Sequence, residues 1–357
     1  MKKHLFFIGT LTNGGAERVV SILSGKMAEQ GMNVEILTYY DFPIFYQVHP
    51  KVRITCVEKE TGTKAKVKNF LWVRKYFKEN ADVLISFLAP FNIFALICNW
   101  GTGTPIIVAD RNDPTKIPSN MLIRKVRDYL YRFADGVVVQ TKKNQNYFSK
   151  QVQKKSEVIY NPINLGERTG SASITLKEKK IVSVGRLMPQ KNQKMLFQAF
   201  KTVLEKYPEY QLVIYGEGPM RGMLENYAKE LGIEANISLP GSVSDVHDRI
   251  KDAEVFVLSS EYEGMPNALI EAMCLGLPVI STKVSGATDL IIDHENGLLT
   301  ELDNQKELEN AMLELIGNPT LAEKLAKNAI ELNNSLELNK IMNQWIYFIK
   351  KTTAEKH

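Results

Sequence analysis

The chain has 357 residues, a length that predicts two domains of roughly 150 residues each. Hydrophobic residues make up 44% and charged residues 24%, which excludes disordered, collagen-like and coiled-coil proteins. The apolar runs are far shorter than the roughly 20 residues of a membrane span. The apolar segment 4–10 is predicted to be a strand rather than a signal peptide. Cys56, Cys98 and Cys274 are far apart, which argues against a disulfide framework or a cysteine metal site and fits a reducing cytoplasm.

The net charge of +5 hides an asymmetry, because residues 1–165 carry +11 and the remainder carries −6. A basic half can face nucleic acid, an anionic membrane or an acidic substrate. A second basic and aromatic run covers 124–132, and the densest one comprises Lys64, Lys66, Lys68, Arg74, Lys75 and Lys78. Two interpretations remain open for this densest run. It is either a surface helix whose aromatic residues face the core, or a helix on an anionic bilayer with Trp72 and Phe77 inserted.

Short apolar runs alternate with helical periodicity through the first half of the chain. The predicted strands cover 4–10, 33–39, 52–57, 82–87, 105–110, 136–141 and 158–164. The predicted helices begin near residue 16 and cover about 64–79, 91–99 and 119–133. This alternation predicts a parallel sheet with helices on both faces.

A polar segment, 165–180, has the composition of a linker, and a second α/β series follows it. Its predicted strands cover 180–186, 211–218, 237–241, 255–260, 278–282 and 297–300. Its predicted helices cover about 192–206, 219–231, 244–251, 266–276, 305–315 and 320–331. A last helix, 336–351, places Ile341, Trp345, Phe348 and Ile349 near one face. The prediction is therefore an α/β protein with two Rossmann-like domains, 1–165 and 166–335.

The first turn carries two adjacent glycines, Gly14 and Gly15, directly before a helix. They would let the backbone pass close to a ligand, with the amides of the helix start directed at it. The alternative is a tight strand-to-helix turn without a ligand. The segment is not a GxGxxG and holds no Walker lysine, so dinucleotide-binding and P-loop interpretations are weak.

The string SSEYEGMPNALIEAM, residues 259–273, joins a predicted strand to a predicted helix that has Pro266 at its first position. The free amides at this helix start would bind an anion, with the helix dipole adding to them. Glu263 and Glu271 flank that position, a layout that suits a diphosphate with a sugar on either side. The alternative is a capped helix with one exposed and one salt-bridged glutamate.

Two further strand ends carry polar or glycine-rich turns. In VGRLMPQKN, Arg186 and Lys191 suit a diphosphate, because arginine binds through a fork and lysine as a point charge. They could equally be solvated surface charges. In YGEGP, Gly216 brings the backbone close at the next strand end. Ligands bind at the carboxyl ends of the strands in open α/β sheets.

The segments GRLMPQKN, YGEGPM, EYEGMPNALIEAM and PVISTKVSGATDLI, in this order, resemble the retaining glycosyltransferases of family four. GGAER near the start also fits the bacterial polysaccharide and lipid-linked glycan branch of that family. The resemblance implies the GT-B fold, with the donor held by the C-terminal domain and the acceptor by the N-terminal one. It also implies that the last helix, about 336–357, packs back on the N-terminal domain.

The resemblance assigns roles to individual residues. Arg186 and Lys191 would bind the donor diphosphate, Glu271 the ribose, and Glu263 the donor sugar. The other implied donor-site residues are Gly264, Met265, Pro266, Asn267 and Gly216, and those lining the opposite side of the cleft are Gly14 and Gly15.

The chain departs from the family at one catalytic position. Many relatives have a histidine where this chain reads Asp110-Arg111-Asn112-Asp113-Pro114, so Arg111 takes that place. The five histidines include no other good candidate. Arginine cannot act as a base at neutral pH, but it can stabilise developing negative charge. The alternative for Arg111 is a buried ion pair with Asp110 or Asp113.

The expected reaction moves a hexose or N-acetylhexosamine, with UDP as the nucleotide, to a glycan acceptor carried on a lipid. Retention would follow from attack on the face from which the diphosphate leaves. None of the twelve aspartates forms an Asp-x-Asp pair, so no metal and no cofactor besides the donor are expected. The enzyme would act in the cytoplasm, bound through its N-terminal domain to the anionic inner face of the membrane.

Two alternatives stay open. Glu263 and Glu271 could be the carboxylates of a glycoside hydrolase, although Arg186 and Lys191 would then have no phosphate to bind. The basic half could instead belong to a nucleic-acid-binding protein, but no recognition motif of that kind is visible, so no nucleic-acid partner is expected.

Overall fold

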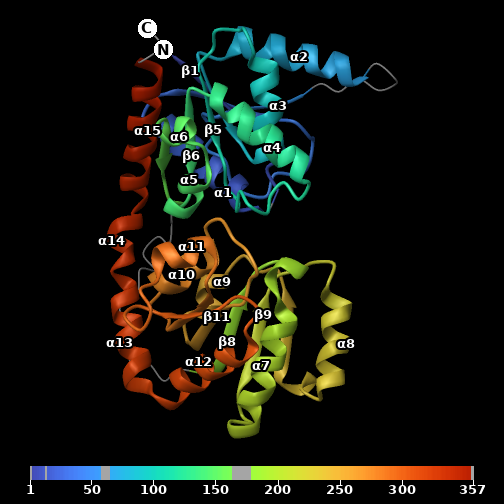
Figure 1. The fold of residues 1–357 in the computed structure, drawn as a ribbon, viewed down its shortest axis with the longest axis vertical. Helices are drawn as coiled ribbons and strands as arrows, with labels where there is room; N and C mark the ends of the chain where they lie inside the picture. Colours follow the sequence, from blue (N-terminus) through green and yellow to red (C-terminus); the bar gives the residue numbers. More distant parts are fainter. Residues whose placement is uncertain (1, 13, 58–64, 163–177, 355–357) are drawn as a thin grey trace. The chain divides into compact units, whose positions relative to one another are not determined.

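The computed structural model describes residues 2–12, 14–57, 65–162 and 178–354. The chain divides into two compact units (Figure 1). Unit 1 comprises Met1–Pro162 and Leu338–His357, and unit 2 comprises Ile163–Glu337. The predicted domain boundary at residue 165 lies outside the described residues.

Unit 1 contains a seven-stranded sheet whose strands all run parallel. The strands are β1 Lys3–Ile8, β2 Asn33–Thr38, β3 Arg53–Cys56, β4 Val83–Phe87, β5 Ile106–Ala109, β6 Gly136–Val139 and β7 Ser156–Val158. Their order is β3-β2-β1-β4-β5-β6-β7, so the winding direction reverses between β1 and β4. In such a sheet the carboxyl edge beside the reversal is the usual ligand position.

The helices of unit 1 connect these strands. They are α1 Gly15–Glu29, α2 Ala65–Asn80, α3 Ala89–Asn99, α4 Met121–Leu130, α5 Lys142–Tyr147, α6 Lys150–Gln153 and α15 Leu338–Ala354. A 3-10 turn, Tyr131–Phe133, extends α4. The short helices α5 and α6 are absent from the predicted elements, because their polar sequences carry little apolar periodicity.

The helix α2 corrects one prediction. The bilayer interpretation, which we expected to place the basic half on a membrane, has Phe77 inserted, and this is wrong, because its side chain is fully buried and its ring lies 5.3 Å from that of Phe7. Trp72 is partly buried and stacks on Tyr76 with ring centroids 4.8 Å apart. Arg74, one of the six basic residues of the predicted membrane surface, donates a hydrogen bond to the Cys98 carbonyl at the end of α3. Another of the six, Lys64, lies outside the described residues.

The helix α15 belongs to unit 1 although it follows unit 2 in the chain. Its apolar face, Ile341, Trp345, Phe348 and Ile349, is buried. The Trp345 ring stacks on Phe87 of β4 at 5.8 Å. On β6, a Cβ at Gly136 would lie 2.9 Å from the Phe348 ring, so the glycine permits this close packing.

Unit 2 contains a six-stranded parallel sheet of order β10-β9-β8-β11-β12-β13. The strands are β8 Glu178–Val184, β9 Gln211–Tyr215, β10 Ile237–Gly241, β11 Ala253–Leu258, β12 Val279–Thr282 and β13 Leu298–Thr300. The helices are α7 Gln193–Lys206, α8 Arg221–Leu231, α9 Val246–Ile250, α10 Asn267–Cys274, α11 Ser285–Leu290, α12 Gln305–Gly317, α13 Pro319–Ile330 and α14 Leu332–Leu336. The winding reverses between β8 and β11, so these two strands end side by side.

Both sheets are covered by helices, and the fold class is the predicted α/β class with two Rossmann-like domains. None of the helices in the described part of the chain combines the length and hydropathy of a membrane span. The three cysteines are free thiols.

Candidate active site

The carboxyl edge of the unit 2 sheet gathers the turns that follow β8 and β11. The turn after β8 carries Arg186, whose side chain is exposed, and ends at Lys191 in a short 3-10 turn. The turn after β11 carries Glu263. The structure thus brings these three predicted residues to one edge of one sheet.

Lys191 and Glu263 form the central contact of this edge. The Lys191 Nζ lies 2.5 Å from Oε1 of Glu263, and both side chains are largely buried. The Ser260 hydroxyl donates a second hydrogen bond to the same Oε1, at 2.9 Å. A Cβ on Gly185 would lie 3.0 Å from Lys191 Cε, so the lysine passes directly over this glycine. The cation and the carboxylate that the sequence assigned to phosphate and sugar are therefore in contact.

Further hydrogen bonds hold the two turns together. The Glu261 amide donates to the Gln190 carbonyl at 2.8 Å, and the Gln190 side chain donates to the Tyr262 carbonyl at 2.7 Å. The Ser259 hydroxyl donates to the Lys191 carbonyl at 2.8 Å. These bonds fix the backbone on both sides of the Lys191–Glu263 pair, so the pair is preorganised.

The helix α10 begins beside this pair. Pro266 is its N-cap rather than its first helical residue, since Asn267 opens the helix and the Pro266 backbone is extended. Pro266 has no N–H, so the donors at this end are the amides of the following residues. Gly264 and Met265 are buried, and a Cβ on Gly286 of α11 would lie 2.4 Å from the Gly264 carbonyl oxygen. This packing fixes the turn that leads into α10.

Glu271 lies on the second turn of α10 and faces a residue that the sequence analysis missed. The His247 Nε2 on α9 lies 3.0 Å from Glu271 Oε2, and both side chains are largely buried. The predicted set excluded His247 because no local motif surrounds it. Its place on the segment that follows the carboxyl end of β10 was the available signal.

Gly216 lets the backbone of the turn after β9 pack closely against the backbone of the turn after β8. A Cβ on Gly216 would lie 1.9 Å from the Gly185 carbonyl oxygen, and one on Gly218 would lie 2.3 Å from that of Leu187. The two glycines therefore let the turn after β9 pack against the turn that carries Arg186. This packing fixes the backbone of both turns at the carboxyl edge of the sheet.

The carboxyl edge of the unit 1 sheet carries the other predicted residues. Gly14 is the N-cap of α1 and Gly15 its first residue. A Cβ on Gly14 would lie 1.9 Å from a carboxylate oxygen of Glu17. The Glu17 carboxylate therefore lies against Gly14 at the start of α1.

Arg111 follows β5 on the same edge. Its side chain is buried, and none of its three guanidinium nitrogens has a hydrogen-bond partner among the described residues. Burial lowers the pKa of Arg111 to about 9, which leaves it protonated at neutral pH. An ion pair of Arg111 with Asp110 or Asp113 is not found in the described part of the chain. Asp110 pairs with Arg127, although its charge partly offsets the lowered pKa of Arg111, and Asp113 accepts a hydrogen bond from the Thr115 hydroxyl.

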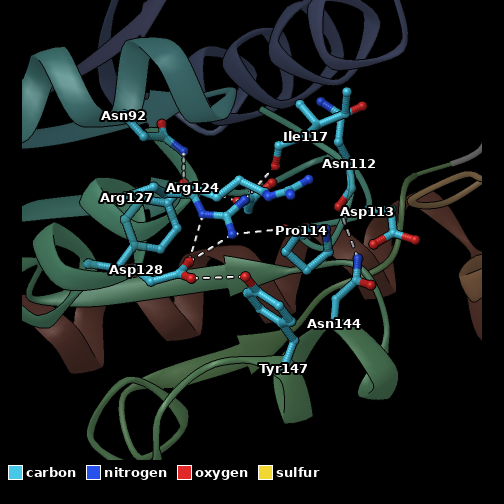
Figure 2. Close-up of polar contacts among 12 residues, drawn as sticks. Asn92, Asn112, Asp113, Pro114, Ile117, Arg124, Arg127, Asp128, Asn144 and Tyr147 are labelled. Carbon is cyan, nitrogen blue, oxygen red and sulfur yellow. Dashed lines mark hydrogen bonds and ion pairs between the residues drawn. The ribbon is translucent and has the colours of Figure 1, made fainter. Parts of the chain in front are cut away.

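Arg127 of α4 is a second buried arginine, for which the sequence pattern predicted no role (Figure 2). Its guanidinium donates to the Asp128 carboxylate at 2.7 Å and to the carbonyls of Pro114 and Ile117 at 2.8 and 2.5 Å. It lies 3.7 Å from the Asp110 carboxylate. Burial raises the pKa of Asp110, and the charge of Arg127 opposes this shift.

Other side chains hold the same loop, residues 110–120. The Asn144 amide donates to the Asn112 carbonyl at 3.1 Å (Figure 2). The Arg124 guanidinium donates to the Thr115 carbonyl at 2.6 Å. The Tyr147 hydroxyl donates to Asp128 at 2.9 Å, which orients the carboxylate that binds Arg127. The loop that carries Arg111 is therefore fixed from two helices, α4 and α5.

The fold and these two edges define a class: a glycosyltransferase with the GT-B fold. Two family profiles match the chain, "Glycosyltransferase Family 4" over residues 13–167 and "Glycosyl transferases group 1" over residues 169–332. The chain belongs to the family-four glycosyltransferases. The glycosyltransferase prediction is confirmed, rather than the hydrolase or nucleic-acid alternatives.

Several relatives match along most of their length. An α-1,4-N-acetylgalactosaminyltransferase of Campylobacter jejuni that acts on a GalNAc–GalNAc–diNAcBac diphospho-undecaprenol is 29% identical, covering 98% of both chains. A second Campylobacter jejuni enzyme, an N-acetylgalactosamine–diacetylbacillosaminyl-diphospho-undecaprenol 4-α-N-acetylgalactosaminyltransferase, is 32% identical over 86% of this chain and 88% of its own.

The fold is shared with solved structures of low identity. Anabaena HepE, solved with UDP and glucose, superposes with a TM-score of 0.85 at 18% identity, covering 98% of this chain and 100% of its own. The sucrose-phosphate synthase of Thermosynechococcus elongatus superposes with a TM-score of 0.84 at 19% identity, covering 99% and 100%. The predicted GT-B fold is confirmed.

Proposed function

We propose that this glycosyltransferase moves an N-acetylhexosamine or hexose from a UDP-sugar to a glycan carried on a lipid diphosphate. The two Campylobacter relatives act on undecaprenol-linked glycans, and HepE was solved with UDP, which supports this choice of substrates. The observation that carries the proposal is the Lys191–Glu263–Ser260 cluster, held beside the start of α10 and next to the turn with Arg186.

The donor diphosphate would lie against Arg186, Lys191 and the first amides of α10. These groups stabilise the negative charge that develops on the leaving phosphate, and such stabilisation usually lowers the reaction barrier more than any other single effect. Glu263 would accept hydrogen bonds from the transferred sugar, and Glu271 from the ribose. Because Lys191 already pairs with Glu263, the cation is held in place before the donor binds, and little reorganisation is needed.

The reaction is proposed to retain the anomeric configuration. The acceptor hydroxyl oxygen forms the new bond to the anomeric carbon on the face where the bond to the diphosphate breaks. Its proton passes to the leaving phosphate oxygen, so no protein base is required. Arg111, buried and without a hydrogen-bond partner among the described residues, is proposed to stabilise negative charge on a substrate.

The proposed reaction uses no metal, because Arg186, Lys191 and the helix start supply the positive charge. It takes place in the cytoplasm at the inner face of the membrane, where unit 1 reaches the lipid-linked acceptor. The basic charge of residues 1–165 supports this placement.

A direct assay tests the proposal. The purified protein is incubated with UDP-GalNAc, UDP-GlcNAc, UDP-galactose or UDP-glucose and a short-chain lipid diphosphate disaccharide. One donor should extend the acceptor by one sugar, detected by mass spectrometry, and proton coupling constants of the product should show the α configuration of the donor. A β-linked product refutes retention. If none of the four UDP-sugars serves as donor and none raises the melting temperature of the protein, the choice of a UDP-sugar is refuted.

A further inference from the structure

On α4 an arginine is buried and apolar side chains face solvent, which is the reverse of an ordinary amphipathic surface helix. The one fully buried residue of α4 is Arg127. Leu130 packs partly against the core, whereas Leu122, Val126, Tyr129 and, in the following turn, Phe133 are exposed, as are Met121 and Ile123 at the helix start. The first four of these exposed residues are spaced four, three and four residues apart, which places them on one stripe along the helix. The stripe therefore faces away from the core.

The orientation of this helix is fixed by strong interactions. The Arg127 guanidinium is bound by the Asp128 carboxylate and by the carbonyls of Pro114 and Ile117 (Figure 2). Turning the apolar stripe inward would bring this bound guanidinium out of the interior and break all of these bonds. The exposure of the stripe is thus a property of the native packing.

Neighbouring residues enlarge the stripe. The Trp100 ring at the end of α3 lies 4.9 Å from the ring of Phe133, which in turn lies 5.5 Å from that of Tyr129. We define the α4 face as five exposed residues: Trp100 (58% exposed), Leu122 (71%), Val126 (48%), Tyr129 (57%) and Phe133 (43%). A contiguous exposed patch of this kind marks an interaction surface.

The charges beside the α4 face are positive. Lys125 and Arg132 are exposed and lie one residue before Val126 and Phe133, on the same flank of the stripe. The Arg132 guanidinium lies 5.7 Å from the centre of the Tyr129 ring. The one acidic residue of α4, Asp128, is paired with Arg127. The face thus combines an apolar stripe, a tryptophan, a tyrosine and a cationic flank.

We infer that the α4 face binds an anionic lipid bilayer, with Trp100, Leu122 and Phe133 entering the headgroup region. This combination is that of a helix lying in a membrane interface, where cations meet lipid phosphates and aromatic rings sit between water and hydrocarbon. The inference rests on the proposed function, because a lipid-linked acceptor lies in the membrane and the enzyme must bind there to reach it. It replaces the surface expected on α2, whose Phe77 is in the core.

The three tryptophans allow a direct measurement. Trp345 is buried against Phe87, so in a Trp72→Phe variant the one exposed tryptophan is Trp100. This full-length variant is mixed with vesicles of phosphatidylcholine and phosphatidylglycerol that carry brominated acyl chains. Trp100 emission should be quenched by at least a quarter, and the further Trp100→Phe change should remove the quenching. If the protein binds the vesicles but its Trp100 emission is not quenched, the inference is overturned.

A matched pair of variants locates the surface by vesicle sedimentation. Leu122→Ser with Val126→Ser and Phe133→Ser should lower the bound fraction at least tenfold. The control, Val67→Ser with Leu71→Ser, removes equally exposed apolar residues from α2 and should leave binding within twofold. Circular dichroism confirms that each variant is folded. Equal losses in both variants, or none in either, overturn the assignment to α4.

Charge and self-association give two further outcomes. Lys125→Glu with Arg132→Glu should weaken binding to anionic vesicles several-fold. If the wild type instead forms dimers that the α4 triple variant dissociates, and ignores vesicles at low salt, the face binds a second copy and the inference is overturned.

The test separates this inference from the proposed function. The α4 triple variant should transfer sugar normally to a water-soluble, short-chain acceptor and lose transfer to an acceptor embedded in vesicles. Normal transfer to the embedded acceptor by this variant overturns the inference. Absence of transfer by the wild type to the soluble acceptor refutes the proposed function, whatever the vesicles show.

Discussion

In unit 2, Lys191 at the sheet edge is paired with Glu263, and Arg186 beside it is exposed. In unit 1, Arg127 is fully buried and donates four hydrogen bonds, while the buried Arg111 has no hydrogen-bond partner among the described residues. The difference teaches that the charge of an arginine or lysine does not reveal its role. Lys191 lies at the sheet edge in an ion pair with Glu263, Arg127 holds the loop, and Arg111 is a buried cation that we propose to stabilise negative charge on a substrate.

The largest effect should follow from Arg127→Met. The change removes the donor shared by the Asp128 carboxylate and two loop carbonyls, and it removes the cation beside the buried Asp110, which keeps the Tyr131 hydroxyl, so unfolding free energy should fall by about 3–5 kcal/mol. All three tryptophans belong to unit 1, so urea denaturation followed by tryptophan fluorescence reports this unit. Arg124→Met, on the same helix, should cost about 1 kcal/mol. Equal losses in the two variants would contradict a structural role special to Arg127.

The next largest effect should follow from changes at the proposed donor site. Lys191→Ala and Glu271→Ala should each lower kcat/KM by about 10- to 150-fold, because one charge-assisted contact is worth about 1.5–3 kcal/mol. Melting temperatures should fall in both variants, because each change removes one partner of a largely buried ion pair, so rates are compared at a temperature where circular dichroism shows both variants folded. Lys201→Ala, exposed on α7, is the control and should match the wild type. Near-normal turnover in both site variants would reject the site.

Arg111→Met should separate stability from activity. Removing a buried charge that lacks a hydrogen-bond partner should leave unfolding free energy unchanged or raise it by about 1 kcal/mol. Transfer should fall about tenfold, which corresponds to about 1.4 kcal/mol. The two measurements are urea denaturation and initial rate. A variant that loses stability as Arg127→Met does, with unchanged rate per folded molecule, would make Arg111 structural.

A smaller effect is expected from His247→Gln. If the imidazole positions Glu271 for the ribose, KM for the donor should rise about fivefold while kcat stays within twofold, a change of about 1 kcal/mol. His294→Gln, an exposed position of the same unit, should leave both constants unchanged. A fall in kcat with constant KM would argue against a positioning role.

No effect is expected from chelation. Transfer in excess EDTA should equal transfer without it, because the proposed site stabilises the diphosphate with protein cations and helix amides. Loss of activity with EDTA that magnesium or manganese restores would overturn the proposal of a metal-independent reaction.

The sequence predicted most strands and helices because buried parallel strands are short apolar runs and the main helices have clear periodicity. It predicted a helix over 119–133 but not which face is buried, since a bound Arg127 overrides the apolar pattern. The insertion of Phe77 was wrong because the same residue types serve a core and a bilayer. His247 was missed because its proximity to Glu271 depends on two segments 24 residues apart, which no local pattern encodes.

The return of α15 to unit 1 has a consequence for synthesis on the ribosome. Unit 2 is continuous in sequence, so it can fold once residue 337 has left the exit tunnel. Unit 1 is made from both ends of the chain, and its β4 and β6 wait for Trp345 and Phe348 to cover them. Of these two units, the one whose synthesis starts earlier is therefore completed later, and until α15 leaves the exit tunnel the uncovered apolar surface of unit 1 is the part of the nascent chain most in need of a chaperone.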